Sequence, residues 1–330
     1  MKKIFYAIAI SCLAFASCSK NEADPINSKT TLDDMVVINY LPVEHLTNST
    51  KALVTGTTFE TNLTFGSLAY FYEDANVTSP TIYIPKQEIS YDGSQWTTAN
   101  AYYWPKSDDA YLAFYSFYPY AVAGYMQYSE SAKNGLIVNT YDVDANQAHD
   151  VMIATAVPKA TKKLYAENGV STVFNHILSV IKKITIKTKE DYSATQTFAL
   201  KSVTLNGVDY EGTFDGTAWT ATADKAKDVT LFDGDLAFTK DETNVKITDN
   251  EYYIVLPQNI TAAKTLTIVY TITTGESVET VTNALDITTL ETFGINKAYQ
   301  FDLTIQEDKI TWNPSVVDWD KIETTSITVE

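Results

Sequence analysis

The chain has 330 residues and a formal net charge of −17 at pH 7, and its basic residues are all lysines. Polyanion-binding proteins generally carry a basic stripe, often with arginine, so this composition argues against nucleic acid as a partner. The length is enough to bury about two hydrophobic cores, and the strong acidity favours solubility and opposes nonspecific association.

The N-terminal segment has the pattern of an export signal. Two lysines precede an apolar run over residues 4–16, which is too short to span a bilayer core of roughly 30 Å. Small residues then lead to Cys18 in a pattern that resembles a bacterial lipobox, although Phe15 stands where such motifs usually have Leu. The sequence predicts a signal peptide over residues 1–17, lipidation at Cys18 and a flexible tether over residues 18–34. An ordinary cleaved signal peptide is the alternative.

The first predicted strand covers residues 35–41 and ends at Pro42. Alternation gives it two apolar faces, one with Met35, Val37 and Leu41 and the other with Val36, Ile38 and Tyr40. We therefore expect a strand that is buried on both sides. Burial of six apolar side chains at roughly 1.5–3 kcal/mol each amounts to on the order of 10 kcal/mol, which is comparable with the whole stability of a domain.

The polar segment that follows this strand contains Lys51 and Ala52 in a setting rich in Ser, Thr and Asn. It has the composition of an exposed hinge with one basic residue. A protease that cut after Lys51 would remove the first strand and leave an apolar groove, which would recruit another strand by β-augmentation. A first strand followed by an ordinary loop is the alternative.

From residue 53 onward the composition is typical of β-structure, because Thr, Val, Ile and Tyr are abundant. Clean alternation predicts strands at residues 265–272 and 301–306, and glycine-containing turns separate such runs. Short helices are expected at most, at residues 174–180 and 288–293. Many short strands with these turns favour β-sandwiches, so the predicted fold class is all-β.

A polar, lysine-rich stretch over residues 159–169 predicts a domain boundary. The expected organisation is an N-terminal β-sandwich over residues 35–165, with a removable first strand, and a C-terminal β-sandwich over residues 166–330. The aromatic residues at 102–104 and 111–118 belong to the first of these. At this density aromatic side chains are expected to fill the core. A sugar-stacking platform of Tyr102, Tyr103 and Trp104 is the alternative.

The chain lacks the common motifs of catalysis and metal binding. Its only cysteines, Cys12 and Cys18, lie in the export segment, and no histidine has a second ligand at metal spacing. Residues 142–146 begin like a calcium loop, but Gln147 stands at the sixth position and Ile153 at the twelfth, where Gly and Glu are required. We therefore expect no catalytic residue, no metal, no cofactor and no enzyme activity. A hydrolase with carboxylates facing each other across a cleft remains an open class.

The C-terminal tail after Trp319 is β-prone. The stretch begins at Ile322 and places Thr325, Ile327 and Val329 on one face. Residues 322–329 are therefore a candidate donor strand for another subunit. A last strand within its own domain is the alternative.

Several segments of the chain, taken together and in their order, resemble the motifs of one known family. They are the lipobox at Cys18, Thr50-Lys51-Ala52, and residues 65–72, 103–105, 112–119, 150–154, 174–179, 253–258, 294–303 and 317–319. Together they resemble the fimbrillin family, the lipoprotein-derived type V pilins of Bacteroidetes. The resemblance covers nearly the whole chain.

This resemblance implies two transthyretin-like, Ig-like β-sandwich domains in tandem, exported as a lipoprotein to the outer membrane and cell surface. It implies a fimbrial subunit that serves adhesion. A trypsin-like protease would cut between Lys51 and Ala52, and a strand from another copy or a related fimbrillin subunit would fill the groove by strand exchange. The family usually has Arg at this position, so Lys51 implies a protease that accepts lysine. A surface glycan-binding lipoprotein is the alternative function.

Overall fold

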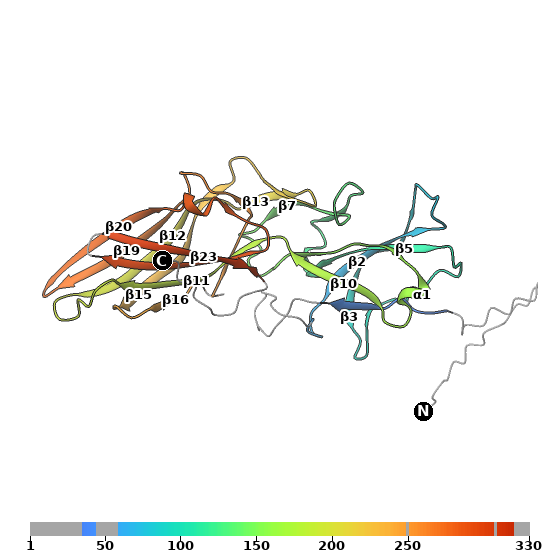
Figure 1. Cartoon of the computed structure of the whole chain (residues 1–330), viewed down its shortest axis with the longest axis horizontal. Coiled ribbons are helices and arrows are strands. Elements are labelled where there is room, and N and C mark those ends of the chain that lie inside the picture. Colours follow the sequence, from blue (N-terminus) through green and yellow to red (C-terminus); the bar gives the residue numbers. More distant parts are fainter. Residues whose placement is uncertain (1–34, 44–58, 249–250, 307–308, 320–330) are drawn as a thin grey trace, which may run out of the picture. The chain divides into compact units, whose positions relative to one another are not determined.

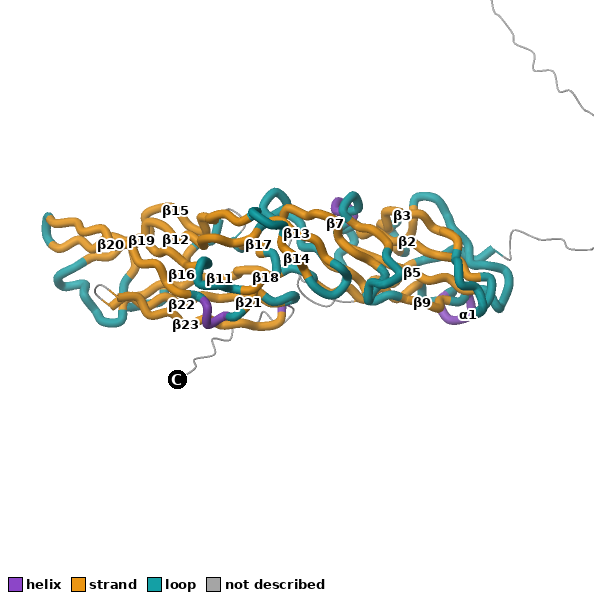
Figure 2. The backbone as a smooth tube through the Cα atoms, turned by 90° about the horizontal axis from the view of Figure 1, so that it is seen from above, coloured by secondary structure: helices purple, strands orange, loops and turns teal. Residues whose placement is uncertain are grey.

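A computed structural model of the chain describes residues 35–43, 59–248, 251–306 and 309–319 (Figure 1). The described residues from Val36 onward belong to one compact unit. Strands make up most of the described chain, with only short helical turns (Figure 2), so the all-β prediction is confirmed. The division into two tandem sandwiches stays a prediction.

The largest sheet carries the first strand, which spans Tyr40–Val43 and runs through Pro42, so the predicted bounds of 35–41 are wrong; before it, Val37 makes only an isolated bridge with Tyr103. Its strands are β1 (Tyr40–Val43), β2 (Phe65–Tyr72), β3 (Thr81–Tyr91), β4 (Trp96–Thr98), β5 (Tyr111–Tyr118), β8 (Met152–Ala154), β9 (Val157–Ala160) and β10 (Val170–His176). They follow the order β2-β3-β4-β1-β10-β8-β5-β9, and β2 also pairs with β5. β1 thus lies inside the sheet, between β4 and β10 (Figure 1, blue beside β10).

A smaller sheet packs against the β2–β5 part of the large one. It consists of β6 (Met126–Tyr128), β7 (Leu136–Asp142), β13 (Glu211–Phe214) and β14 (Trp219–Ala221). Residues from β2, β5, β7 and β13 share one hydrophobic cluster, while the opposite face of β2 and β5 joins a second cluster with β1, β4 and β10. From Leu112 onward β5 is consequently buried on both faces, which confirms the core role predicted for its aromatic residues except Tyr111, which is half-buried.

Two further sheets enclose a third hydrophobic cluster. One contains β11 (Ser179–Thr188), β16 (Thr243–Val245), β17 (Tyr253–Val255), β22 (Lys297–Gln306) and β23 (Lys309–Asp318). The other contains β12 (Thr197–Asp209), β15 (Ala226–Phe238), β19 (Thr265–Thr274) and β20 (Ser277–Asp286). A short pair of β18 (Gln258–Asn259) and β21 (Thr292–Phe293) completes the described strands.

The helical elements within the described residues are α1 (Lys162–Tyr165) and 3-10 turns at Tyr120–Val122 and Thr288–Leu290, and Trp319 is also in 3-10 conformation. The short helix expected at residues 288–293 is therefore present only as a single turn. The helix expected at residues 174–180 is wrong, because these residues end β10 and begin β11.

Strand pairing crosses the domain boundary expected at residue 165, and this boundary stays a prediction. β10 lies beyond that boundary yet pairs with β1 and β8, which precede it. β13 likewise pairs with β7. The backbone passes from the large sheet to the β11 sheet at Ile177 and Leu178, between β10 and β11.

Candidate functional site

The first strand is joined to neighbours on both sides by backbone hydrogen bonds. β1 pairs in parallel with β10 from Tyr40↔Val170 to Val43↔Val173, and it pairs antiparallel with β4 at Tyr40↔Trp96. Upstream of β1, the Ile38 amide donates to the Tyr102 carbonyl at 2.8 Å and the Trp104 amide donates to the Val36 carbonyl at 2.9 Å. Residues 36–43 therefore fill a slot whose walls come from other parts of the sheet.

Two side chains anchor this segment in the core. Ile38 is 1% exposed and Tyr40 is 3% exposed. The Tyr40 ring makes edge contacts with Phe65 and Phe114, each at 5.8 Å between ring centroids. Burial raises the pKa of the Tyr40 phenol above its ordinary value, because the charged phenolate is disfavoured in the core. Removal of this segment would uncover Phe65, Phe114 and Trp96, which lie in the same cluster.

The other face of the segment is not buried, and here the prediction of burial on both sides is wrong. On this face Met35 is 38% exposed, Leu41 is 45% exposed and Val37 is half-buried. Val36, on the same face as the two anchoring side chains, is also only half-buried. The covering sheet of β6, β7, β13 and β14 contacts β2 and β5, and the hydrophobic cluster that it shares with them contains no residue of β1. With two fully buried side chains, burial contributes about 3–6 kcal/mol, about a third of the value expected from six.

Gly169 is a feature of the slot that the sequence analysis missed. Its φ of +79° is unfavourable for other residues, and a Cβ there would lie 2.9 Å from the Tyr40 carbonyl carbon. Glycine thus permits the close approach that lets the Val170 amide donate to the Asn39 carbonyl at 2.7 Å. The Asn168-Gly169 pair signals a turn in the sequence, but the backbone that it approaches is more than a hundred residues away.

The remaining predicted site residues lie outside the described part of the chain. They are the lipidation residue Cys18, the processing residues Lys51 and Ala52, and the donor-strand residues Ile322, Thr325, Ile327 and Val329. Of the displaced-strand residues, the structure places Ile38 and Tyr40 in the core and brings them together with β4 and β10. The removal of the strand stays a prediction.

The aromatic platform weighed as an alternative at residues 102–104 is not an open surface. Trp104 is 4% exposed and packs at 6.0 Å against Phe114, while Tyr102 and Tyr103 are half-buried. Trp104 therefore belongs to the core.

Another group of aromatic residues is more accessible, and we call it the surface tyrosine cluster: Tyr70, Tyr72, Tyr111 and Tyr128, all half-buried. Tyr72 and Tyr111 stack at 4.6 Å with 9° between their planes, and Tyr70 lies 4.3 Å from Tyr128. The Lys159 ammonium lies 5.9 Å over the Tyr111 ring. The cluster combines apolar rings and phenol hydroxyls at the surface, a composition typical of recognition surfaces.

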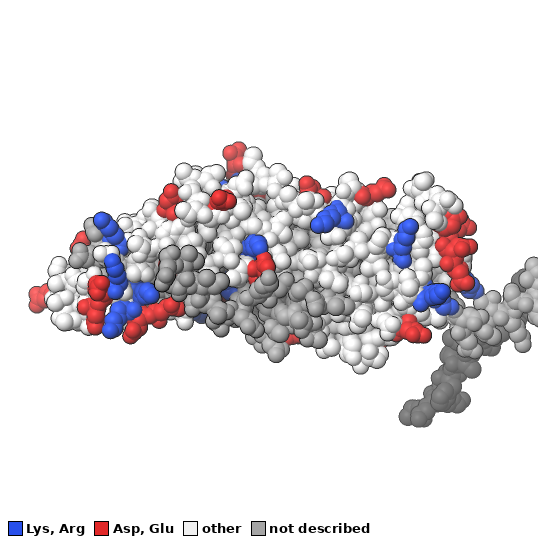
Figure 3. Space-filling model, viewed as in Figure 1, with Lys and Arg blue, Asp and Glu red and all other residues white. Residues whose placement is uncertain are grey.

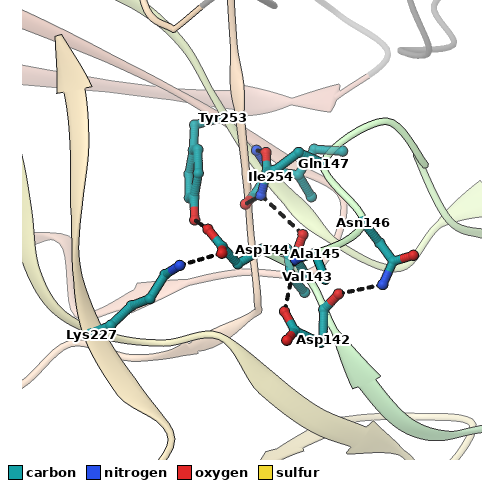
Figure 4. Close-up of polar contacts among 9 residues, drawn as sticks. All are labelled: Asp142, Val143, Asp144, Ala145, Asn146, Gln147, Lys227, Tyr253 and Ile254. Atoms are coloured by element: carbon teal, nitrogen blue, oxygen red, sulfur yellow. Dashed lines mark hydrogen bonds and ion pairs between the residues drawn. The ribbon is translucent and has the colours of Figure 1, made fainter. Parts of the chain in front are cut away.

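The loop that begins like a calcium site instead ties strands together (Figure 4). The Gln147 side chain donates to the Ile254 carbonyl at 2.7 Å and accepts from the Ile254 amide at 2.8 Å. Asp144 accepts from the Tyr253 hydroxyl at 3.0 Å and pairs with Lys227. Burial, followed by the nearby Asp144 carboxylate, raises the pKa of Tyr253. The loop therefore fastens the end of β7 to β15 and β17.

The visible surface carries lysines scattered among acidic side chains, with no continuous basic track on the face that Figure 3 shows. Within the described ranges, no group of three or more His, Cys, Asp or Glu residues is placed to hold a metal ion. The part of the chain that the structure describes also has no helix that is long and apolar enough to cross a membrane.

Comparison with known proteins identifies one matching family model, described as fimbrillin-like, over residues 50–319. No curated protein matches the chain. Several solved structures share its fold. A fimbrial protein from Bacteroides vulgatus is 17% identical with a TM-score of 0.60, covering 77% of this chain and 92% of its own. A cell adhesion protein from Bacteroides uniformis is 19% identical with a TM-score of 0.52, covering 87% of this chain and 100% of its own.

Proposed function

The chain belongs to the fimbrillin-like family, and from this premise we propose that it is a structural subunit of a cell-surface fimbria that serves adhesion. The family assignment confirms the resemblance drawn from the sequence motifs. The observation that carries the proposed mechanism is the position of β1 inside the large sheet, between β4 and β10. A strand in that position leaves a gap when it is removed, because the neighbours on both sides lose their partner.

We propose that assembly begins with proteolysis between Lys51 and Ala52 by a trypsin-like enzyme that accepts lysine. The cut would release residues up to Lys51, including β1, and leave β10 unpaired from Val170 to Val173. A strand from another copy or a related fimbrillin subunit would then fill the slot by β-augmentation. Residues Ile322 to Val329 are the candidate donor, since their alternation can present Thr325, Ile327 and Val329 to one face. The proposed role is structural and requires no enzyme activity.

We propose that Cys18 anchors the precursor in the outer membrane before processing. Cys18→Ala is expected to abolish labelling by radioactive or clickable acyl precursors, because the thiol is the only attachment point for the lipid in the lipobox pattern. The same variant should move from the membrane fraction to the soluble fraction. Cys12→Ala is the matched control and should keep both properties. Unchanged membrane retention of Cys18→Ala would contradict the lipoprotein hypothesis.

A second candidate function is glycan binding at the surface. The surface tyrosine cluster of Tyr70, Tyr72, Tyr111 and Tyr128 favours it, because half-exposed aromatic rings with hydroxyls suit ligands that have both apolar and polar edges. The alternative platform at Tyr102, Tyr103 and Trp104 does not favour it, since Trp104 is buried.

Electron microscopy of cells that express the protein separates the two candidates. Gold-labelled antibodies are expected to decorate filaments along their length if the protein is a fimbrial subunit. Cells that carry Lys51→Ala should keep the label at the cell surface and lack labelled filaments. Label spread over the surface of wild-type cells, with no filament decorated, would overturn the fimbrial proposal and favour the glycan-binding protein.

A further inference from the structure

A buried group of three side chains, Asp150, His176 and Trp319, joins the large sheet to the end of β23. The Nδ1 atom of His176, at the end of β10, lies 2.9 Å from a carboxylate oxygen of Asp150, and both side chains are fully buried. The imidazole lies nearly flat on the indole of Trp319, with ring centroids 4.4 Å apart and planes at 10°. Trp319 is 0% exposed. The position and orientation of the imidazole are thus fixed by Asp150, and Trp319 is seated on it.

Trp319 is also held through its backbone. It directly follows β23, which pairs with β22 along its whole length, and its amide donates to the Asn296 carbonyl at 3.0 Å. The neighbouring residue Asp318 pairs with Lys297 at the start of β22. The chain is therefore fastened at its last described residue, beyond which residues 320–330 begin.

We propose that Trp319 is the anchor of the C-terminal tail. It is a positioning residue that holds the point where the tail follows β23, which we call the root of the donor strand, against His176 at the end of β10. This inference rests on the proposed role of residues 322–329 as the donor. A root held in place lowers the entropy lost when the tail binds, because fewer residues remain to be ordered.

The attachment of the tail at Trp319 can be tested without strand exchange between subunits. In a Lys51→Ala background, cleavage of the bond after Lys321 by a lysine-specific protease reports how often the root is released. Trp319→Ala is expected to speed this cut about tenfold, which corresponds to a loss of about 1.4 kcal/mol of anchoring. Trp319→Phe keeps a ring on His176 and should remain near the wild-type rate. Leu136→Ala is the matched control, since Leu136 is buried in the same hydrophobic cluster on β7. An equal rise in Leu136→Ala and Trp319→Ala would overturn the anchor and leave Trp319 as an ordinary core residue.

A second assay measures the consequence for strand donation with one protein that can only donate and one that can only accept. The donor carries Lys51→Ala, so its own slot stays filled; the acceptor is cut after Lys51 and lacks residues 320–330. Their heterodimer, followed by size-exclusion chromatography, is expected to form about tenfold more slowly when the donor also carries Trp319→Ala. A donor with Leu136→Ala should match the wild type. If no donor forms a heterodimer, the strand-exchange function fails and the protease assay alone decides the anchor. If all donors react equally, the anchor has no role in donation.

Discussion

Cutting the chain after Lys51 is expected to convert a monomeric precursor into ladders of subunits that survive mild denaturant. The precursor should remain monomeric because β1 occupies its slot at high effective concentration as part of the same chain. After the cut, Ile38 and Tyr40 can leave, and β10 and the ring faces of Phe65 and Phe114 lose their cover. An inserted strand buried along its length would dissociate slowly. Size analysis of the digested protein, with N-terminal sequencing to identify Ala52 at the new end, measures the result.

Two variants separate the parts of this mechanism. Lys51→Ala should block the ladders, because the cut itself is lost. Deletion of residues 322–330 should weaken them while leaving the cut intact, because the acceptor slot opens but the donor is absent. Protein that carries Ala52 at its N-terminus and stays a folded monomer at high concentration would rule out strand exchange triggered at Lys51. The glycan-binding function would then be the better hypothesis.

Tyr40→Ala is expected to lower the free energy of unfolding by about 3–5 kcal/mol, the range for removing a buried aromatic ring. Tyr40 is 3% exposed and contacts Phe65 and Phe114, so the substitution leaves a cavity in the core. Leu41→Ala is the matched control on the adjacent residue, whose side chain is 45% exposed. It should cost about 1 kcal/mol or less. Urea denaturation followed by circular dichroism measures both values.

The comparison of these two neighbours also tests how the first strand is held. A similar loss at Tyr40 and Leu41 would mean that both faces of the strand are covered in solution, contrary to the exposed face described above. Tyr40→Ala should in addition make the uncut precursor slowly competent to accept a strand, because the slot opens more often when its main side-chain anchor is gone.

The strands were predictable from the sequence wherever one face meets the core and the other meets water. Leu266, Ile268 and Tyr270 are fully buried in β19 while the residues between them are half-buried, and the same holds for β22. Alternation of apolar and polar residues did not predict the strands at residues 174–180, where β10 ends and β11 begins within a few residues. Residues 174–180 mix apolar side chains with Asn175, His176 and Ser179 and do not alternate regularly, so a helix could not be told from two strands.

The faces of the first strand were harder to predict, because alternation reports which residues share a face and not which face is covered. Met35, Val37 and Leu41 are as apolar as Val36, Ile38 and Tyr40. Coverage depends on where the small sheet of β6, β7, β13 and β14 packs. The pairing of β13 with β7 joins residues about seventy positions apart, and nothing local in either strand specifies it.

The contacts around Trp319 could not be predicted for the same reason. His176 and Trp319 lie in two separate motifs of the sequence, and nothing in either motif points to the other. Their stacking, at 4.4 Å between ring centroids, depends on the end of β23 reaching the end of β10. The spacing of residues in the sequence does not predict this contact between His176 and Trp319. It follows from the parallel pairing of β11 with β22 and the antiparallel pairing of β22 with β23.

The loop between Asp142 and Gln147 has a mechanical consequence for a subunit in a filament. A pulling force between the large sheet and the β11 sheet would load the backbone crossing at Ile177 and Leu178. The paired hydrogen bonds of Gln147 with Ile254, and those of Asp144 with Tyr253 and Lys227, offer a second route for the same force (Figure 4). Tension shared among parallel routes leaves less strain on each, so the subunit should behave as a stiff link that stretches little under load.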